Sequence, residues 1–274
     1  MRQVQQEYLA QLFAALGSDR VTSLAGIRLG WGHYGEIGYP HPTYGAHTNS
    51  YWAFDDIAQG HASGLPTGVP ACPVPGWIPG TSGPTQAQAF VHWYLEALLN
   101  YQQWQITTVR AHYAGPLVVL YGSRGVRPGQ IDDAVAASLN GSTAAEIDSD
   151  LQRGFDYQRL VNGITDLNVA PCTTWLDCTF GNPDDASSDP VQWTPVHYLH
   201  YLASQRGLRI WSENTGHGSY DTMALCFKRM QTFDVHALLW AFHAELYSGR
   251  YATMDQYAQL IKQYQSAGRC RRNT

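Results

Sequence analysis

Apolar side chains follow two distinct patterns along this chain. In residues 4–16 and again in residues 85–113 they recur every three to four positions, which predicts helices with one buried face. Pro84 stands where the second of these helices should begin. Residues 117–121 instead form an unbroken apolar run, which is typical of a strand covered on both faces.

The rest of the chain repeats this alternation of short apolar runs and longer amphipathic segments. Strands are predicted at 24–31, 117–121, 167–171, 207–212 and 236–240. Helices are predicted at 4–16, 51–59, 85–113, 129–138, 144–162, 192–205, 219–231 and 253–266. Such alternation indicates an α/β fold with a parallel sheet, built from five strand–helix units. We expect one domain over residues 1–274, with a Pro- and Gly-rich surface loop at 61–84.

Two glutamates follow predicted strands and are surrounded by aromatic and polar residues. Glu36 lies in Gly-Glu-Ile-Gly-Tyr-Pro, and Glu213 lies in Trp-Ser-Glu-Asn-Thr-Gly. Glycosidic bond cleavage needs two carboxyl groups: one protonates the leaving oxygen, and the other attacks the sugar or activates a water. We therefore predict Glu36 as the acid/base and Glu213 as the nucleophile. Burial of Glu36 among aromatic residues would suit an acid, whereas polar neighbours such as Asn214 would keep Glu213 ionised.

Other aromatic and polar residues near the predicted strand ends are candidates for substrate binding: Trp31, His33, Tyr39, Tyr121, Arg124, Trp175, Asn214, Trp240, His243 and Glu245. Several have a structural alternative. Arg124 could form a surface ion pair, Trp240 could belong to the core, and Glu245 is a rival for the catalytic carboxylate. No spacing of His or Cys indicates a metal site, and we expect no cofactor.

Composition narrows the class of protein. Charged residues make up only 14% of the chain, against roughly 25% in an average protein, and aromatic residues make up 12%. The aromatic excess fits a carbohydrate-binding cleft or an unusually aromatic core. A net charge of −5 without a long basic run argues against a nucleic-acid partner. No stretch of eighteen apolar residues predicts a membrane span, and no signal peptide is recognised, so a cytoplasmic location is the default unless a signal was removed.

The positions of the two glutamates resemble those of clan A glycoside hydrolases. In that family, a (β/α)8 barrel carries the acid/base after the fourth strand and the nucleophile after the seventh. Two predicted strands lie between Glu36 and Glu213, and one more ends at Trp240, where the family places an aromatic residue. Gly35 stands where clan A usually has Asn. Gly-Glu-Ile-Gly-Tyr-Pro instead resembles the acid motif of β-amylases, which invert configuration, and residues 51–56 resemble β-galactosidase-like members.

The resemblance implies a partial barrel that contains strands four to eight. A barrel without strands one to three leaves apolar strand edges open, so we expect a homo-oligomer that covers the open edge. The function it implies is a retaining glycoside hydrolase. An inverting hydrolase, or a carbohydrate-binding or vestigial fragment with little turnover, remains the alternative.

Overall fold

The computed structural model describes residues 2–30, 32–43, 48–215, 219–241, 243–250 and 252–272, without the side chains of residues 33, 243 and 267–272. The chain divides into two compact units, Met1–Val169 and Ala170–Thr274. The expectation of one domain over residues 1–274 stays a prediction.

The first unit contains six helices, two strands and one short 3-10 turn among its described residues. In chain order these are α1 (Arg2–Leu16), α2 (Ser18–Thr22), β1 (Ile27–Leu29), η1 (His33–Gly35), α3 (Pro84–Arg110), β2 (Leu117–Tyr121), α4 (Gln130–Ala136), α5 (Ala144–Ile147) and α6 (Tyr157–Asn162). Strand β3 (Val169–Thr173) begins at the boundary between the units. The second unit continues with η2 (Pro190–Gln192), α7 (Pro195–Ser204), β4 (Ile210–Glu213), α8 (Tyr220–Thr232), β5 (Val235–Leu239), α9 (His243–Ser248) and α10 (Met254–Arg272).

The strands form one sheet whose spatial order is their chain order, β1-β2-β3-β4-β5. β1 pairs with β2, β3 with β4 and β4 with β5, each in parallel, with Ile27 opposite Leu117 and Ser212 opposite Leu238. A doubly wound α/β sheet reverses its strand order at a switch point, whereas strands of a barrel follow one another without reversal. The observed order therefore confirms the predicted class: parallel βα units of the TIM-barrel type.

The core of the first unit is aromatic. Helix α3 begins after Gly83 with Pro84 at its first position, where the fixed φ of proline suits a helix start. Its buried face carries Phe90 and Tyr94, and Tyr51 packs edge-on against both rings. Trp77 also contacts Phe90. The segment between η1 and α3 thus anchors its aromatic side chains on α3, and part of the aromatic excess belongs to this core.

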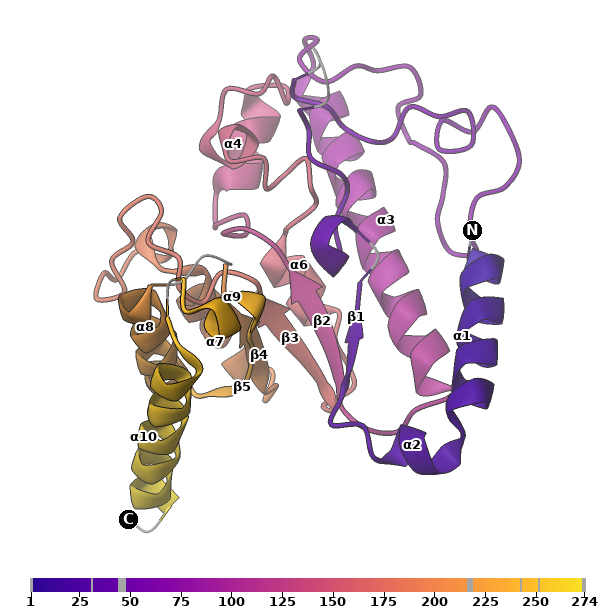
Figure 1. Cartoon of the computed structure of the whole chain (residues 1–274). Coiled ribbons are helices and arrows are strands. Elements are labelled where there is room, and N and C mark those ends of the chain that lie inside the picture. Colours follow the sequence, from indigo (N-terminus) through magenta and orange to yellow (C-terminus); the bar gives the residue numbers. More distant parts are fainter. Residues whose placement is uncertain are drawn as a thin grey trace. The chain divides into compact units, whose positions relative to one another are not determined.

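Helix α1 lies alongside α3 in the first unit (Figure 1). The hydroxyl of Tyr101 in α3 donates a hydrogen bond to Gln5 Oε1 in α1 at 3.3 Å, and Arg2 lies over the Trp104 ring. Much of α1 is nevertheless exposed, including Val4 (64% exposed) and Tyr8 (60%).

Two predicted helices differ from the structure. Residues 51–59 form turns, because the Asp55 carboxylate accepts hydrogen bonds from the backbone N–H groups of Ile57 and Ala58 and caps a local turn. The helix predicted over 144–162 is interrupted between α5 and α6. Ser149 and Gly154 there have positive φ, and the Asp156 side chain accepts a hydrogen bond from Arg159 N at the start of α6.

In the second unit, α8 and α10 pack side by side (Figure 1), with Phe227 of α8 edge-on against Tyr257 of α10. Helix α8 is capped by Ser219, whose Oγ accepts a hydrogen bond from Thr222 N. Among the described residues, no helix combines the length and the apolar character that a membrane span requires.

Candidate functional site

Glu36 is positioned by a tight turn at the end of β1. After Leu29 the chain passes through Tyr34 and Gly35, both with positive φ, and Gly32 N donates a hydrogen bond to Glu36 O at 2.9 Å. The next residue, Ile37, is fully buried, and its N–H donates to Leu120 O of β2 at 2.8 Å. The backbone O of Glu36 is therefore bonded within the turn, and the residue after it is bonded to β2.

The Glu36 carboxylate lies directly over Gly122, the residue that follows β2. A Cβ atom at position 122 would lie 2.5 Å from all three carboxyl atoms of Glu36, so any larger residue would displace the carboxylate from this place. Glu36 is 5% exposed. The carboxylate thus occupies a nearly closed position at the carboxyl end of two parallel strands, which is where active sites of barrel enzymes gather.

Arg153 holds this carboxylate. Its Nη2 lies 2.5 Å from Glu36 Oε2, and the guanidinium stacks over the Phe155 ring at 4.5 Å. The backbone O of Arg153 also accepts a hydrogen bond from Tyr39 N at 2.9 Å. Residues 36–39 are therefore joined to the segment between α5 and α6 by both a side-chain and a backbone contact.

A second buried acid lies close to Arg153. Asp150 is 2% exposed, and burial raises its pKa from the ordinary 3.8 to about 7. A hydrogen bond with Ser123 and the charges of Arg127 and Arg153 oppose this rise, while Asp148 adds to it. Within the described part of the chain, Asp150 Oδ1 has no hydrogen-bond partner. Arg153 therefore interacts with two buried acids, Glu36 and Asp150, and Arg127 acts on the second of them.

Three predicted binding residues of the first unit are held by internal contacts. The Tyr39 ring stacks on Tyr94 at 4.1 Å, and its hydroxyl donates to Tyr94 O. Tyr121 is fully buried and donates to Gln102 Oε1. Arg124 lies 3.6 Å from Asp148 Oδ2, the ion pair given above as its structural alternative. Trp31 and the side chain of His33 lie outside the described residues. A role for any of the five in substrate binding stays a prediction.

In the second unit, Glu213 ends β4 and is half-buried. Its backbone O accepts a hydrogen bond from Leu176 N at 3.0 Å. The next residue, Asn214, is 1% exposed, and its Oδ1 accepts a hydrogen bond from Ala241 N at 2.6 Å. Asn214 thus ties the end of β4 to the chain that leaves β5.

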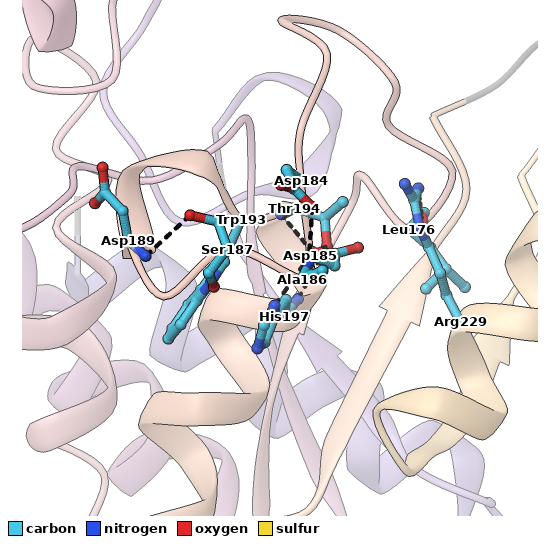
Figure 2. Close-up of polar contacts among 10 residues, drawn as sticks. All are labelled: Leu176, Asp184, Asp185, Ala186, Ser187, Asp189, Trp193, Thr194, His197 and Arg229. Carbon is cyan, nitrogen blue, oxygen red and sulfur yellow. Dashed lines mark hydrogen bonds and ion pairs between the residues drawn. The ribbon is translucent and has the colours of Figure 1, made fainter.

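Asp177 fixes the loop that follows Glu213. Its Oδ1 accepts hydrogen bonds from Thr215 N at 2.7 Å and Thr215 Oγ1 at 2.9 Å. Arg229 of α8 donates a hydrogen bond to Leu176 O at 2.7 Å (Figure 2). These contacts hold the carboxyl ends of β3 and β4 together.

The remaining predicted residues of this unit follow β3 and β5 along the chain. The side chain of Trp175 is half-buried, and the backbone N–H of this residue donates a hydrogen bond to Thr173 Oγ1. Trp240 is half-buried and contacts the Tyr257 ring of α10 with ring centroids 5.4 Å apart. Glu245 lies in α9 and is half-buried, while the side chain of His243 lies outside the described residues. Substrate contacts by these residues stay predictions.

A polar cluster after β3 was not predicted from the sequence. Asp185 Oδ1 accepts hydrogen bonds from Thr194 N and Thr194 Oγ1, each at 2.8 Å, and lies 3.2 Å from His197 Nδ1 (Figure 2). The His197 ring stacks on Trp193 at 4.0 Å. Because Thr194 caps α7, this cluster fastens the loop after β3 to the start of that helix.

The sequence reasoning also missed Gly122, Asp150 and Arg153. Neither Asp150 nor Arg153 belongs to a strand-end motif, and both fall in a segment that was assigned to a helix. The one available signal was chemical: a buried carboxylate needs a cation or hydrogen-bond donors nearby. Among the described residues, no group of three or more His, Cys, Asp or Glu is arranged to hold a metal ion.

Comparison with known proteins supports the fold. No protein family model and no curated protein matches this chain. The solved structure of the catalytic domain of β-amylase from Paenibacillus polymyxa matches with a TM-score of 0.63 and 14% sequence identity, over 96% of this chain and 68% of that one. At 14% identity this match is evidence for a similar fold and for nothing further. The chain has the α/β fold of that catalytic domain, and its five-stranded parallel sheet fits part of a barrel.

Proposed function

We propose that this protein is a glycoside hydrolase in which Glu36 and Glu213 cleave the glycosidic bond. The observation that carries the proposal is the environment of Glu36. A nearly buried carboxylate, over a glycine and against an arginine, lies at the carboxyl end of parallel strands. Removing two charged groups from water costs free energy that their attraction often does not repay. A buried ion pair at this edge of the sheet is therefore better explained by function than by stability.

The proposed roles follow the retaining mechanism. Glu213 attacks the anomeric carbon as the bond to the leaving oxygen breaks, and Glu36 gives its proton to that oxygen. In the second step Glu36 takes a proton from water, and the water oxygen displaces Glu213 from the anomeric carbon. The half-buried position of Glu213 at the end of β4 is consistent with a group that must reach the substrate. The fold similarity to a β-amylase catalytic domain supports a carbohydrate as the substrate class.

The alternative is a carbohydrate-binding barrel fragment with little or no turnover. It is favoured by the internal bonds of the Tyr39 and Tyr121 hydroxyls, which make two predicted sugar contacts less accessible. Loss of turnover with retained sugar binding would support this alternative.

The test is a turnover assay on a panel of α- and β-linked nitrophenyl glycosides and maltooligosaccharides, with Glu213→Gln as the matched control. We expect at least one substrate to be hydrolysed by the wild type and not measurably by Glu213→Gln. NMR of the first sugar released then distinguishes the mechanisms, because retaining enzymes release the substrate's own anomer and inverting enzymes the opposite one. Equal rates for wild type and variant would contradict the proposal.

A further inference from the structure

The segment between α5 and α6 contains Arg153, which contacts Glu36, and the segment is held in place by close packing. Gly154 has φ +81°, and a Cβ there would lie 2.5 Å from Leu98 Cδ2 in α3, so the chain passes α3 where only glycine fits. The neighbouring Phe155 ring is fully buried and supports the Arg153 guanidinium from below. Arg153 therefore reaches Glu36 from a fixed backbone, with 14% of its side chain exposed.

The charges around Glu36 come from several elements. Arg153 contacts it directly, and Asp150 and Arg127 lie behind Arg153, close enough for their charges to act on one another. Asp148 pairs with Arg124 after β2. Arg28 of β1 lies on the other side of the turn, where its Nη2 donates to Tyr34 O at 3.4 Å. Arg153 forms an ion pair with Glu36.

We propose that Arg153 is the positioning residue for Glu36: its guanidinium fixes the carboxylate over Gly122. The inference rests on the proposed function for its kinetic part. A general acid must lie within hydrogen-bond reach of the oxygen that it protonates. A carboxyl group that is already held in place reaches that geometry more readily than a mobile one.

The kinetic test compares wild type, Arg153→Met and Arg153→Lys on a substrate with a poor leaving group and on one with a good leaving group, with Arg159→Met as the control. Arg159 is similarly exposed and pairs with Glu96 and Asp156. In Arg153→Met we expect kcat/KM on the poor substrate to fall by about tenfold or more, because a displaced Glu36 no longer protonates the leaving oxygen well, and to change little on the good substrate. Arg153→Lys should restore part of the loss, because an ammonium keeps the charge and a hydrogen-bond donor. An unchanged kcat/KM on the poor substrate in Arg153→Met, or the same loss in Arg159→Met, would overturn the inference.

A structural test separates this inference from the proposed function. Crystal structures of wild type and Arg153→Met need no substrate. We expect the Glu36 carboxylate to leave its place over Gly122 in the variant and to keep it in Arg159→Met. A carboxylate that stays in place in Arg153→Met would overturn the inference even if the enzyme is active. Absence of turnover by the wild type would instead contradict the proposed function, and the position of Glu36 would still decide the role of Arg153.

Discussion

At the scale of single residues, the surroundings of Glu36 depend on buried charged residues that belong to neither glutamate motif. Glu36 was recognised from the sequence because it follows an apolar run and precedes Tyr39-Pro40. Arg153 and Asp150 were not, because contacts between residues more than a hundred positions apart leave no local pattern. Gly122 follows the apolar run at 117–121, and nothing in the sequence indicates that a carboxylate lies against it.

Gly122 can be tested without any substrate. Its φ is not in the left-handed region, so an added methyl group costs energy mainly by its clash with the Glu36 carboxylate. We expect Gly122→Ala to lower the free energy of unfolding by roughly 1–3 kcal/mol, as overpacking usually does. In a Glu36→Ala background the same change should cost much less. Urea denaturation of wild type, Gly122→Ala, Glu36→Ala and the double variant measures these free energies of unfolding. An equal loss of stability from Gly122→Ala in both backgrounds would show that the added methyl group does not clash with Glu36.

Asp150 makes stability depend on pH. Its folded pKa of about 7 lies above the ordinary 3.8 of the unfolded chain, so the folded protein binds an extra proton between these values. The resulting stabilisation is fully present below about pH 4 and is lost as pH rises through 7. One pKa unit corresponds to about 1.4 kcal/mol, so the total is on the order of 4 kcal/mol.

Asp150→Asn cannot ionise and should therefore gain stability relative to wild type as pH rises. We expect the difference in unfolding free energy between variant and wild type to shift in favour of the variant between pH 5 and pH 8. Chemical denaturation at both values measures it. A difference that does not change with pH would mean that Asp150 titrates normally in the folded protein.

At the scale of elements, the sequence predicted strands best where burial is uniform. The run at 117–121 matches β2 residue for residue, because every side chain of this strand is buried and the apolar pattern is unbroken. The strands around the glutamates are shorter than predicted, since turns with positive φ end them early or delay their start. The break between α5 and α6 was missed because its polar residues, among them Asp150 and Gln152, are buried rather than exposed.

The loop after β4 should depend on Asp177. Its carboxylate accepts two hydrogen bonds from Thr215, and such bonds to a charged group are each worth roughly 1.5–3 kcal/mol. We expect Asp177→Ala to destabilise the protein by about 2 kcal/mol or more, and Asp177→Asn by less, because the amide oxygen still accepts. Thermal and urea unfolding measure both. Equal stability of the two variants would show that these bonds do not hold the loop.

Trp240 tests which groups line the site. Trp240 directly follows β5 and contacts Tyr257 of α10, but its side chain is only half-buried. We expect Trp240→Ala to weaken sugar binding more than stability, whereas a core Trp would cost roughly 3–5 kcal/mol on truncation. Melting temperature and ligand-induced fluorescence are measured on the same variant. A large drop in melting temperature with unchanged affinity would assign Trp240 to the core.

At the scale of the whole molecule, the strand order explains why the fold class could be predicted and the site only in part. Alternating strands and helices in one direction suffice to predict parallel βα units, and the order β1 to β5 confirms them. A site, in contrast, is assembled from several loops whose meeting points no local pattern records. The two glutamates are predicted as catalytic because each follows an apolar run; Glu213 ends β4, and Glu36 follows β1 after a turn.

The open edge of the sheet leads us to propose a homo-oligomer. β1 is the first strand of the sheet, and the neighbouring α1 exposes Val4, Tyr8 and Leu12, which are four residues apart and share one face. Such a surface attracts a partner, and we propose a second copy of the chain. Tyr8→Glu should then shift the protein toward monomers in light scattering at micromolar concentration, whereas Leu167→Glu, at a residue exposed to 70%, should not. A folded wild type that is already monomeric at this concentration would contradict the proposal.

The most direct test of the central claim compares Glu36→Gln and Glu213→Gln on a glycoside with a good leaving group and on one with a poor leaving group. Loss of acid–base help costs roughly 10²–10⁴-fold, so Glu36→Gln should be slow on the poor substrate. On the good one its first step should be partly rescued, because that leaving group needs no proton. Glu213→Gln should be slow on both, because the attacking carboxylate is missing. Full activity of either variant, with an intact fold, would contradict the account.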